Sequence, residues 1–180
     1  MPHFLNLSLS SLTTMLERGE TTSVQLVEQA LAGFDQLNPL INAVVTTHPE
    51  LSMRYAEKAD ALRAKGEIVG PLHGIPMTIK DSLDTFDMNT TWGTEGRTAH
   101  RPGHDAISVA RLRGAGAILV GKTNTPELTL SYQTDNSIFG RTSNPHDLDR
   151  TSGGSSGGAA ALIAAGGTPI DLAPDTGGSI

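Results

Sequence analysis

The residues of this sequence best suited to chemistry are serines in two glycine-rich segments and one lysine after a short apolar run. Residues 153–158 read GGSSGG, residues 175–180 read DTGGSI, and Lys80 follows Met77 to Ile79. A serine hydroxyl is a weak nucleophile at neutral pH and needs a neighbouring base to accept its proton. The pattern therefore favours serine hydrolase chemistry. The open question is which residue is the base.

Histidine does not fit as that base. The frames 153–157 and 154–158 both match the GxSxG nucleophile elbow of α/β-hydrolases, in which the acidic residue and the histidine follow the serine. No histidine follows His146, so this arrangement is excluded within the chain. A Ser-x-x-Lys arrangement is excluded too, because the positions three residues before the lysines hold Tyr55, Leu62, Met77 and Leu119.

Other glycine-based functions fit less well. A GGSSGG segment could be a flexible linker, but an alanine-rich helix and a buried strand are expected directly after it. A phosphate-binding loop would need Lys and Ser or Thr where Ala159 and Ala160 stand. The stretch 114–121 lacks the third glycine of a dinucleotide fingerprint and precedes its strand. His100 and His104 have ligand spacing but flank a Pro-Gly pair, so we expect no metal site.

Lys80 is the remaining candidate base. A lysine can serve if burial lowers its pKa far below the usual value of about 10.4. From the local sequence alone, a surface lysine paired with Asp81 is the favoured interpretation.

Composition narrows the class of protein. The chain has 180 residues with 13 Lys plus Arg against 19 Asp plus Glu, a net charge of −6. This balance argues against binding nucleic acid through its phosphates. The absence of cysteine excludes disulfides, thiolate metal sites and a cysteine nucleophile. No apolar run or leader pattern suggests a membrane span or signal peptide, so we expect a cytoplasmic protein.

The hydrophobic pattern predicts alternating helices and strands, which is typical of an α/β layered fold. The helices are expected from Leu12 to Gly19, from Thr22 with a capping box at Gln25 to Asn38 and Pro39, from Leu51 to Gly66, after an Asp105 cap, after Thr125, and from Ala159 to Ala165. The strands are expected at Ile41 to Thr46, Met77 to Ile79, Ile118 to Val120 and Ile170 to Leu172, with residues 133–152 irregular. The charged face of the third helix is expected to be solvated.

Four ordered blocks together resemble the amidase signature family. They are GIPMTIKD at 74–81, GKTNTPE at 121–127, GGSSGG at 153–158 and DTGGSI at 175–180. The resemblance extends from about residue 10 to the end of the chain. It implies an α/β fold with a mixed central sheet covered by helices, without metal or cofactor.

The resemblance also implies the roles of individual residues. Ser179 corresponds to the nucleophile, Ser155 to the bridging serine after a cis Gly154–Ser155 bond, and Lys80 to the base of a Ser-Ser-Lys triad. The oxyanion hole would consist of the backbone N–H groups of Thr176, Gly177, Gly178 and Ser179. Ser156 and Asp175 correspond to supporting residues.

Two departures and the chain length qualify the resemblance. Many family members have proline where Ser152 stands and a small or polar residue where Pro174 stands. Because family members are more than twice this length, we expect a single N-terminal part of an amidase domain, with a helical lead-in at 1–66 and catalytic-core segments at 67–180.

The expected substrate is a small amide, and association into a homo-oligomer is left as an open alternative. The expected function is carboxamide hydrolysis; the alternatives are the amide-cleaving component of a glutamyl-tRNA amidotransferase, in which other components can contact RNA, or an inactive fragment.

Overall fold

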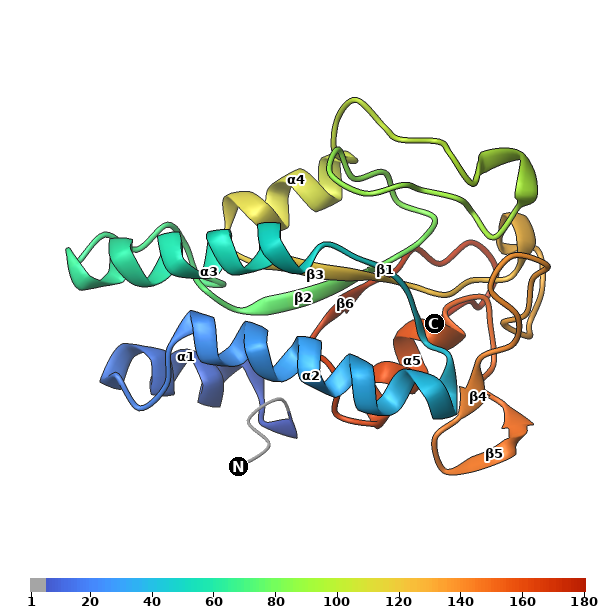
Figure 1. The fold of residues 1–180 in the computed structure, drawn as a ribbon, viewed down its shortest axis with the longest axis horizontal. Coiled ribbons are helices and arrows are strands. Elements are labelled where there is room, and N and C mark those ends of the chain that lie inside the picture. Colours follow the sequence, from blue (N-terminus) through green and yellow to red (C-terminus); the bar gives the residue numbers. More distant parts are fainter. Residues whose placement is uncertain (1–5) are drawn as a thin grey trace.

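A four-stranded sheet with helices on both faces forms the centre of the structure, a computed structural model that describes residues 6–180 (Figure 1). The strands lie in the order β1-β3-β2-β6. Strand β1 (Val44–Thr47) is antiparallel to β3 (Ile118–Thr123), whereas β2 (Pro76–Lys80) runs parallel to both β3 and β6 (Asp171–Leu172). The predicted mixed α/β architecture is therefore confirmed.

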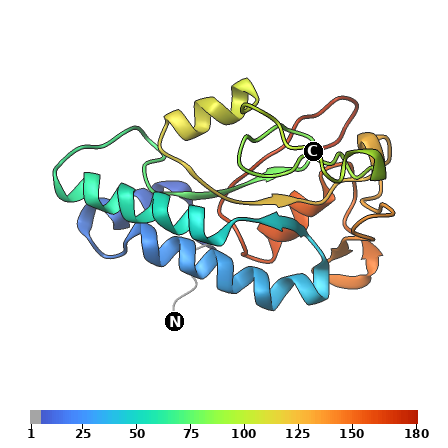
Figure 2. The same ribbon diagram turned by 45° about the horizontal axis from the view of Figure 1, so that its top comes forward.

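Five α-helices surround the sheet in the described part of the chain: α1 (Leu9–Arg18), α2 (Ser23–Ile41), α3 (Pro49–Ala64), α4 (Ile107–Gly114) and α5 (Gly157–Ala164). Figure 1 shows α4 above the strands and α1, α2 and α5 below them. Helices α2 and α3 lie side by side (Figure 2). Short 3-10 turns occupy Glu95–Arg97 and Glu127–Thr129. Within the described residues, no helix is long and apolar enough to cross a membrane.

The sheet separates two hydrophobic cores because successive strand residues point to opposite faces. Ile118 and Val120 of β3 pack with residues of α1, α2, α3 and α5. Met77, Ile79 and Leu119 pack against α4 instead. The alternation therefore determines which strand residues can face α5, the helix that begins at Gly157 within the GGSSGG segment, two residues earlier than predicted.

The first turn of helix α2 has more hydrogen-bond acceptors for its N–H groups than its own sequence predicts. The expected capping box is present, since Thr22 accepts the N–H of Gln25 and the Gln25 side chain accepts the N–H of Thr22. Asp60 of α3 also accepts the N–H groups of Ser23 at 2.8 Å and Val24 at 3.0 Å. The expectation that the whole charged face of α3 is solvated is therefore wrong, because Asp60 binds orphan donors of a neighbouring helix.

The end of α2 also differs from the prediction. The helix continues through Pro39 to Ile41 instead of stopping at Asn38. The Asn38 side-chain oxygen accepts the N–H groups of Ala43 and Val44 at 2.8 and 2.7 Å, so it satisfies the backbone just beyond the helix. The following strand begins at Val44, later than expected.

Two predicted helix starts are wrong. Asp105 does not cap α4, because its carboxylate accepts the N–H of Phe86 and lies 3.1 Å from the Arg113 guanidinium. Thr125 opens only the 3-10 turn Glu127–Thr129, because its hydroxyl instead donates to the Ser155 carbonyl at 3.2 Å. The segment 133–152, expected to be irregular, contains a small hairpin of β4 (Ser143–Asn144) and β5 (Asp147–Thr151).

We predict that Asp60→Ala lowers the free energy of unfolding by about 1 kcal/mol, because two N–H groups at the start of α2 lose their acceptor. Denaturant unfolding followed by circular dichroism measures the change. Glu57→Ala on the exposed side of the same helix is the matched control and should have little effect. Equal stabilities for the two variants would contradict the capping role of Asp60.

Candidate active site

Lys80 ends strand β2 and is completely buried. Its Nζ lies 2.6 Å from Ser155 Oγ and 3.0 Å from Ser156 Oγ, and both serines belong to the segment that leads into α5. The surface pairing with Asp81 that the local sequence favours is not formed. The side chain instead points across the end of the sheet towards the two hydroxyls.

The hydroxyl chain continues to the last predicted site residue. Ser155 Oγ donates to Ser179 Oγ at 2.9 Å, and the backbone N–H of Ser156 donates to the Ser179 carbonyl at 3.1 Å. The Gly154–Ser155 peptide bond is cis, as the resemblance implies. Lys80, the adjacent pair Ser155 and Ser156, and Ser179 lie far apart in the sequence but meet in one hydrogen-bonded cluster.

Glycines let α5 approach the strands closely enough for these contacts. A Cβ atom on Gly158 would lie 2.4 Å from the backbone nitrogen of Asn124, just after β3, which is too close for any side chain. The N–H of Gly157 donates to Thr134 Oγ1 at 3.0 Å. Because the glycines at 157 and 158 are packed inside the structure, the interpretation of GGSSGG as a flexible linker is wrong.

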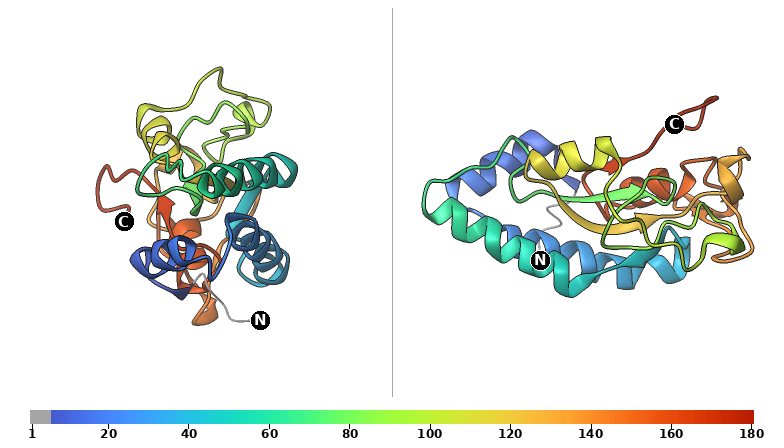
Figure 3. Two further views of the ribbon diagram at one scale, coloured as in Figure 1. Left: turned by 90° about the vertical axis from the view of Figure 1, so that its left-hand side faces the viewer. Right: turned by 90° about the horizontal axis from the view of Figure 1, so that it is seen from above.

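The loop that carries Ser179 is organised by Asp175. The carboxylate accepts the N–H of Gly178 at 2.6 Å and that of Ile180 at 3.1 Å. The N–H groups of Ser179 and Gly178 hold the pKa of this exposed carboxyl below its usual range. Residues 174–178 are exposed, and the loop projects from the rest of the structure (Figure 3). The predicted oxyanion-hole donors, Thr176, Gly177, Gly178 and Ser179, therefore lie in this loop, and Gly178 donates to Asp175.

The electrostatics of the cluster are dominated by burial. Burial lowers the pKa of Lys80 to about 8, although the negative charges of Asp171 and Asp175 oppose this change. Burial also raises the pKa of Asp171 to about 6, against the hydroxyls of Thr78 and Thr123 and the charge of Lys80. At neutral pH about one Lys80 in ten is the neutral amine.

Asp171 is the site residue that sequence reasoning missed. The prediction places it within a strand but gives it no role, although it is the only charged residue in the expected Ile170–Leu172 run. A carboxylate inside a short apolar strand of a layered fold is a usable signal, because burying it requires partners.

A second buried lysine lies on the opposite face of the sheet. Lys122 Nζ is 3.3 Å from Asp81 Oδ1 and also donates to the Leu83 carbonyl and to Thr90 Oγ1. Asp81 in turn accepts the backbone N–H of Thr91. This ion pair explains why Asp81 is not available to Lys80.

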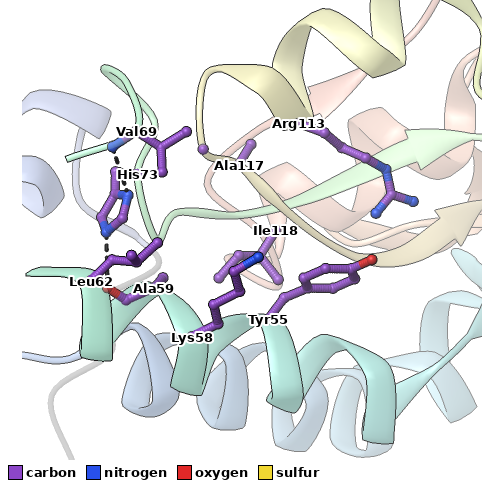
Figure 4. A pocket seen from close by; sticks show the side chains of 10 residues that line it. Tyr55, Lys58, Ala59, Leu62, Val69, His73, Arg113, Ala117 and Ile118 are labelled. Atoms are coloured by element: carbon purple, nitrogen blue, oxygen red, sulfur yellow. Dashed lines mark hydrogen bonds between the residues drawn. The ribbon is translucent and has the colours of Figure 1, made fainter. Parts of the chain in front are cut away.

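Two cavities are relevant to ligand binding. One of about 470 Å³ borders the serine cluster and includes Ser156, Asp171 and Ser179 in its lining. Another of about 290 Å³ lies between α3 and the α4–β3 connection (Figure 4), and none of the serine-cluster residues lines it. There the His73 ring contacts the Ala59 carbonyl and accepts the N–H of Val69, so this histidine supports the fold. In residues 6–180 we find no group of three or more side chains that could hold a metal ion.

We predict that Gly158→Ala destabilises the protein by about 1–3 kcal/mol, because the added methyl group meets backbone that cannot move freely. Urea unfolding measures the loss. Gly33→Ala in α2 is the matched control, since a Cβ there meets no atom within 4 Å. A Gly158→Ala variant as stable as Gly33→Ala would show that the close approach of α5 is not required.

Comparisons with known proteins agree with this geometry. A family model described as Amidase matches residues 25–180. The A-type subunit of glutamyl-tRNA(Gln) amidotransferase from Rhodopirellula baltica is 47% identical over 173 residues, which are 96% of this chain and 35% of that protein.

Solved structures share the fold. Fatty acid amide hydrolase has a TM-score of 0.94 and 28% identity over 100% of this chain and 32% of its own. Peptide amidase from Stenotrophomonas maltophilia has a TM-score of 0.87 and 32% identity over 92% of this chain and 35% of its own. The chain thus spans about a third of the length of the relatives that it matches. Because the family model covers most of its residues, the chain belongs to the amidase signature family.

Proposed function

We propose that this protein hydrolyses the C–N bond of a carboxamide to a carboxylic acid and ammonia or an amine. Ser179 is the nucleophile, Ser155 the bridging serine and Lys80 the base. The observation that supports this most is the unbroken chain from Lys80 Nζ through Ser155 Oγ, at 2.6 Å, to Ser179 Oγ, at 2.9 Å. Residues 1–180 then form the N-terminal part of one amidase domain, with the helical lead-in at 1–66 and the site within 67–180; a cytoplasmic location stays a prediction.

The relay begins with neutral Lys80. Its lone pair accepts the proton of Ser155, and Ser155 accepts the proton of Ser179 as the Ser179 oxygen attacks the amide carbonyl. Ser156 donates no proton to substrate in this scheme, but its hydroxyl lies 3.0 Å from Nζ and holds the amine in place. The relay uses only side chains of this chain.

The same relay in reverse completes the cleavage. When the tetrahedral intermediate collapses, Ser155 protonates the departing nitrogen and recovers its own proton from the Lys80 ammonium. The product is an acyl group on Ser179, and water activated by the same base releases the acid. Protonating the leaving nitrogen matters because an amide anion is a very poor leaving group.

The loop before Ser179 would stabilise the oxyanion. We assign this role to the backbone N–H groups of Thr176, Gly177, Gly178 and Ser179, as in the resemblance. In the structure the N–H of Gly178 donates to Asp175, so the developing oxyanion would compete with that carboxylate for donors. Asp175 is accordingly assigned to ordering the loop.

We predict that Ser179→Ala in the full-length protein lowers amide hydrolysis at least about 10³-fold, because the attacking oxygen is lost. The fold should be unaffected, since Ser179 lies on a projecting loop (Figure 3) and its side chain is outside both hydrophobic cores. Release of ammonia from simple carboxamides gives the rate, and circular dichroism checks the fold. Ser137→Ala, an exposed serine, is the control. Hydrolysis at more than a few percent of the original rate would place the nucleophile elsewhere.

We predict that kcat/KM rises about tenfold per pH unit below pH 8 and levels off above it, because only neutral Lys80 can accept a proton. A pH–rate profile over pH 5.5 to 10 measures this. Lys80→Arg should be inactive throughout the range, since a guanidinium does not lose its proton in proteins. Near-normal turnover by Lys80→Arg would refute a lysine base.

A second function is favoured by the 47% identity to an amidotransferase component. In such a role the same site would release ammonia from glutamine for use by a partner protein. Co-purification from the native cell with a second component, together with hydrolysis that prefers glutamine, would support it. A protein that purifies alone and hydrolyses simple carboxamides supports the amidase function instead.

A further inference from the structure

We infer that Asp171 is a positioning residue for Lys80, whose buried carboxylate balances the positive charge that Lys80 acquires in each turnover. The inference rests on the proposed function, because it assumes that Lys80 is the base. It gives Asp171, which lines the cavity beside the serine cluster, a role in the reaction itself.

The strand register places Asp171 beside Lys80. Asp171 on β6 lies opposite Thr78 on β2, and Lys80 lies opposite Thr123 on β3. Because residues two apart in a strand share a face, Thr78 and Lys80 point to the same side of the sheet. Asp171 Oδ2 accepts the hydroxyls of Thr78 at 2.6 Å and Thr123 at 2.9 Å. The carboxylate is therefore fixed on the side of the sheet that carries the lysine.

One oxygen of this carboxylate lacks a donor. Asp171 Oδ1 is buried and accepts no hydrogen bond from the described residues, which is costly for a charged group unless an opposite charge is near. Lys122 cannot supply that charge, because it pairs with Asp81 on the other face. Lys80 is the buried cation on the same side, although no ion pair joins it directly to Asp171 in the described chain.

Few charged groups act on Lys80. The segment before α5 presents only the hydroxyls of Ser155 and Ser156, and the loop before Ser179 contributes Asp175. Asp175 is exposed, so water and salt screen its charge, whereas Asp171 is partly buried and its Oδ1 atom is fully buried. Of the two carboxylates, Asp171 therefore has the stronger influence on the lysine.

This charge affects two stages of the reaction. When Lys80 accepts the proton of Ser155, the Asp171 carboxylate stabilises the new ammonium and favours the transfer. It also keeps more of the resting lysine protonated, so the enzyme needs a higher pH for full activity. With a pKa of about 6, Asp171 is itself ionised over the range in which Lys80 titrates.

The test is the pH–rate profile of Asp171→Asn in the full-length protein. We expect the acidic limb of kcat/KM to move down by about one pH unit or more, because removing an opposite charge lowers the pKa of the lysine. The plateau rate should fall as well, since a less basic amine is a weaker proton acceptor. Asp149→Asn is the matched control, because it removes the same charge from an exposed residue of β5 that is not part of the serine cluster.

Two further variants keep the test decisive. Asp171→Ala also removes the charge and should move the limb in the same direction. If neither variant folds, Asp171→Ser takes their place: it removes the charge but keeps an oxygen that the hydroxyls of Thr78 and Thr123 can contact, and it should also shift the limb downwards. A limb that stays within about 0.3 unit of the control, or moves up, in the folded variant overturns the inference.

The outcome separates this inference from the proposed function. If the unmodified protein shows no Ser179-dependent hydrolysis, the proposed function fails and takes the inference with it. If hydrolysis depends on Ser179 and Lys80 while the Asp171→Asn profile matches the control, only the role of Asp171 is wrong. A downward shift with a reduced plateau in Asp171→Asn supports both.

Discussion

The contact on which the rest of this structure depends is the burial of the Lys80 amine against Ser155 and Ser156. A buried lysine is costly unless polar groups meet it, so β2 and the start of α5 must lie at a fixed distance. Gly158 permits that distance by packing on Asn124 without a side chain. One short hydrogen-bonded chain, from the Lys80 amine through the serine hydroxyls, therefore depends on three features. They are the local backbone around the serines, the strand register and the position of α5.

Two lysines at the same end of the sheet lie in different environments. Lys80 and Lys122 lie at the ends of neighbouring parallel strands and are both fully buried, but they point to opposite faces. Lys122 has Asp81 at 3.3 Å and is held as one half of an ion pair. Lys80 meets hydroxyls of Ser155 and Ser156, which can bind the neutral amine as well as the ammonium. Of the two, only the surroundings of Lys80 fit the proton exchange that the proposed function requires.

Much of this structure can be predicted from local sequence, and the main functional residues that were missed share one cause. The capping box at Thr22, the strand ending at Lys80 and the helix after GGSSGG depend on neighbouring residues, and the structure has them. The role of Asp60 is not visible locally, because its partners belong to another helix, 36 and 37 residues away. The same holds for Asp171, since Thr78 and Thr123 become its neighbours only when the sheet forms.

The cavity beside Ser179 is lined mainly by small residues. Most of its described lining consists of glycine, alanine and serine, with Ile163 and Leu172 among the larger apolar side chains. Small residues provide space and let the backbone approach a substrate, but they offer few groups that distinguish one acyl group from another. Under the proposed function, the chemistry would reside in the relay from Lys80, which contacts only the reacting amide group. In that case the choice of substrate would depend on residues that surround the relay without taking part in it.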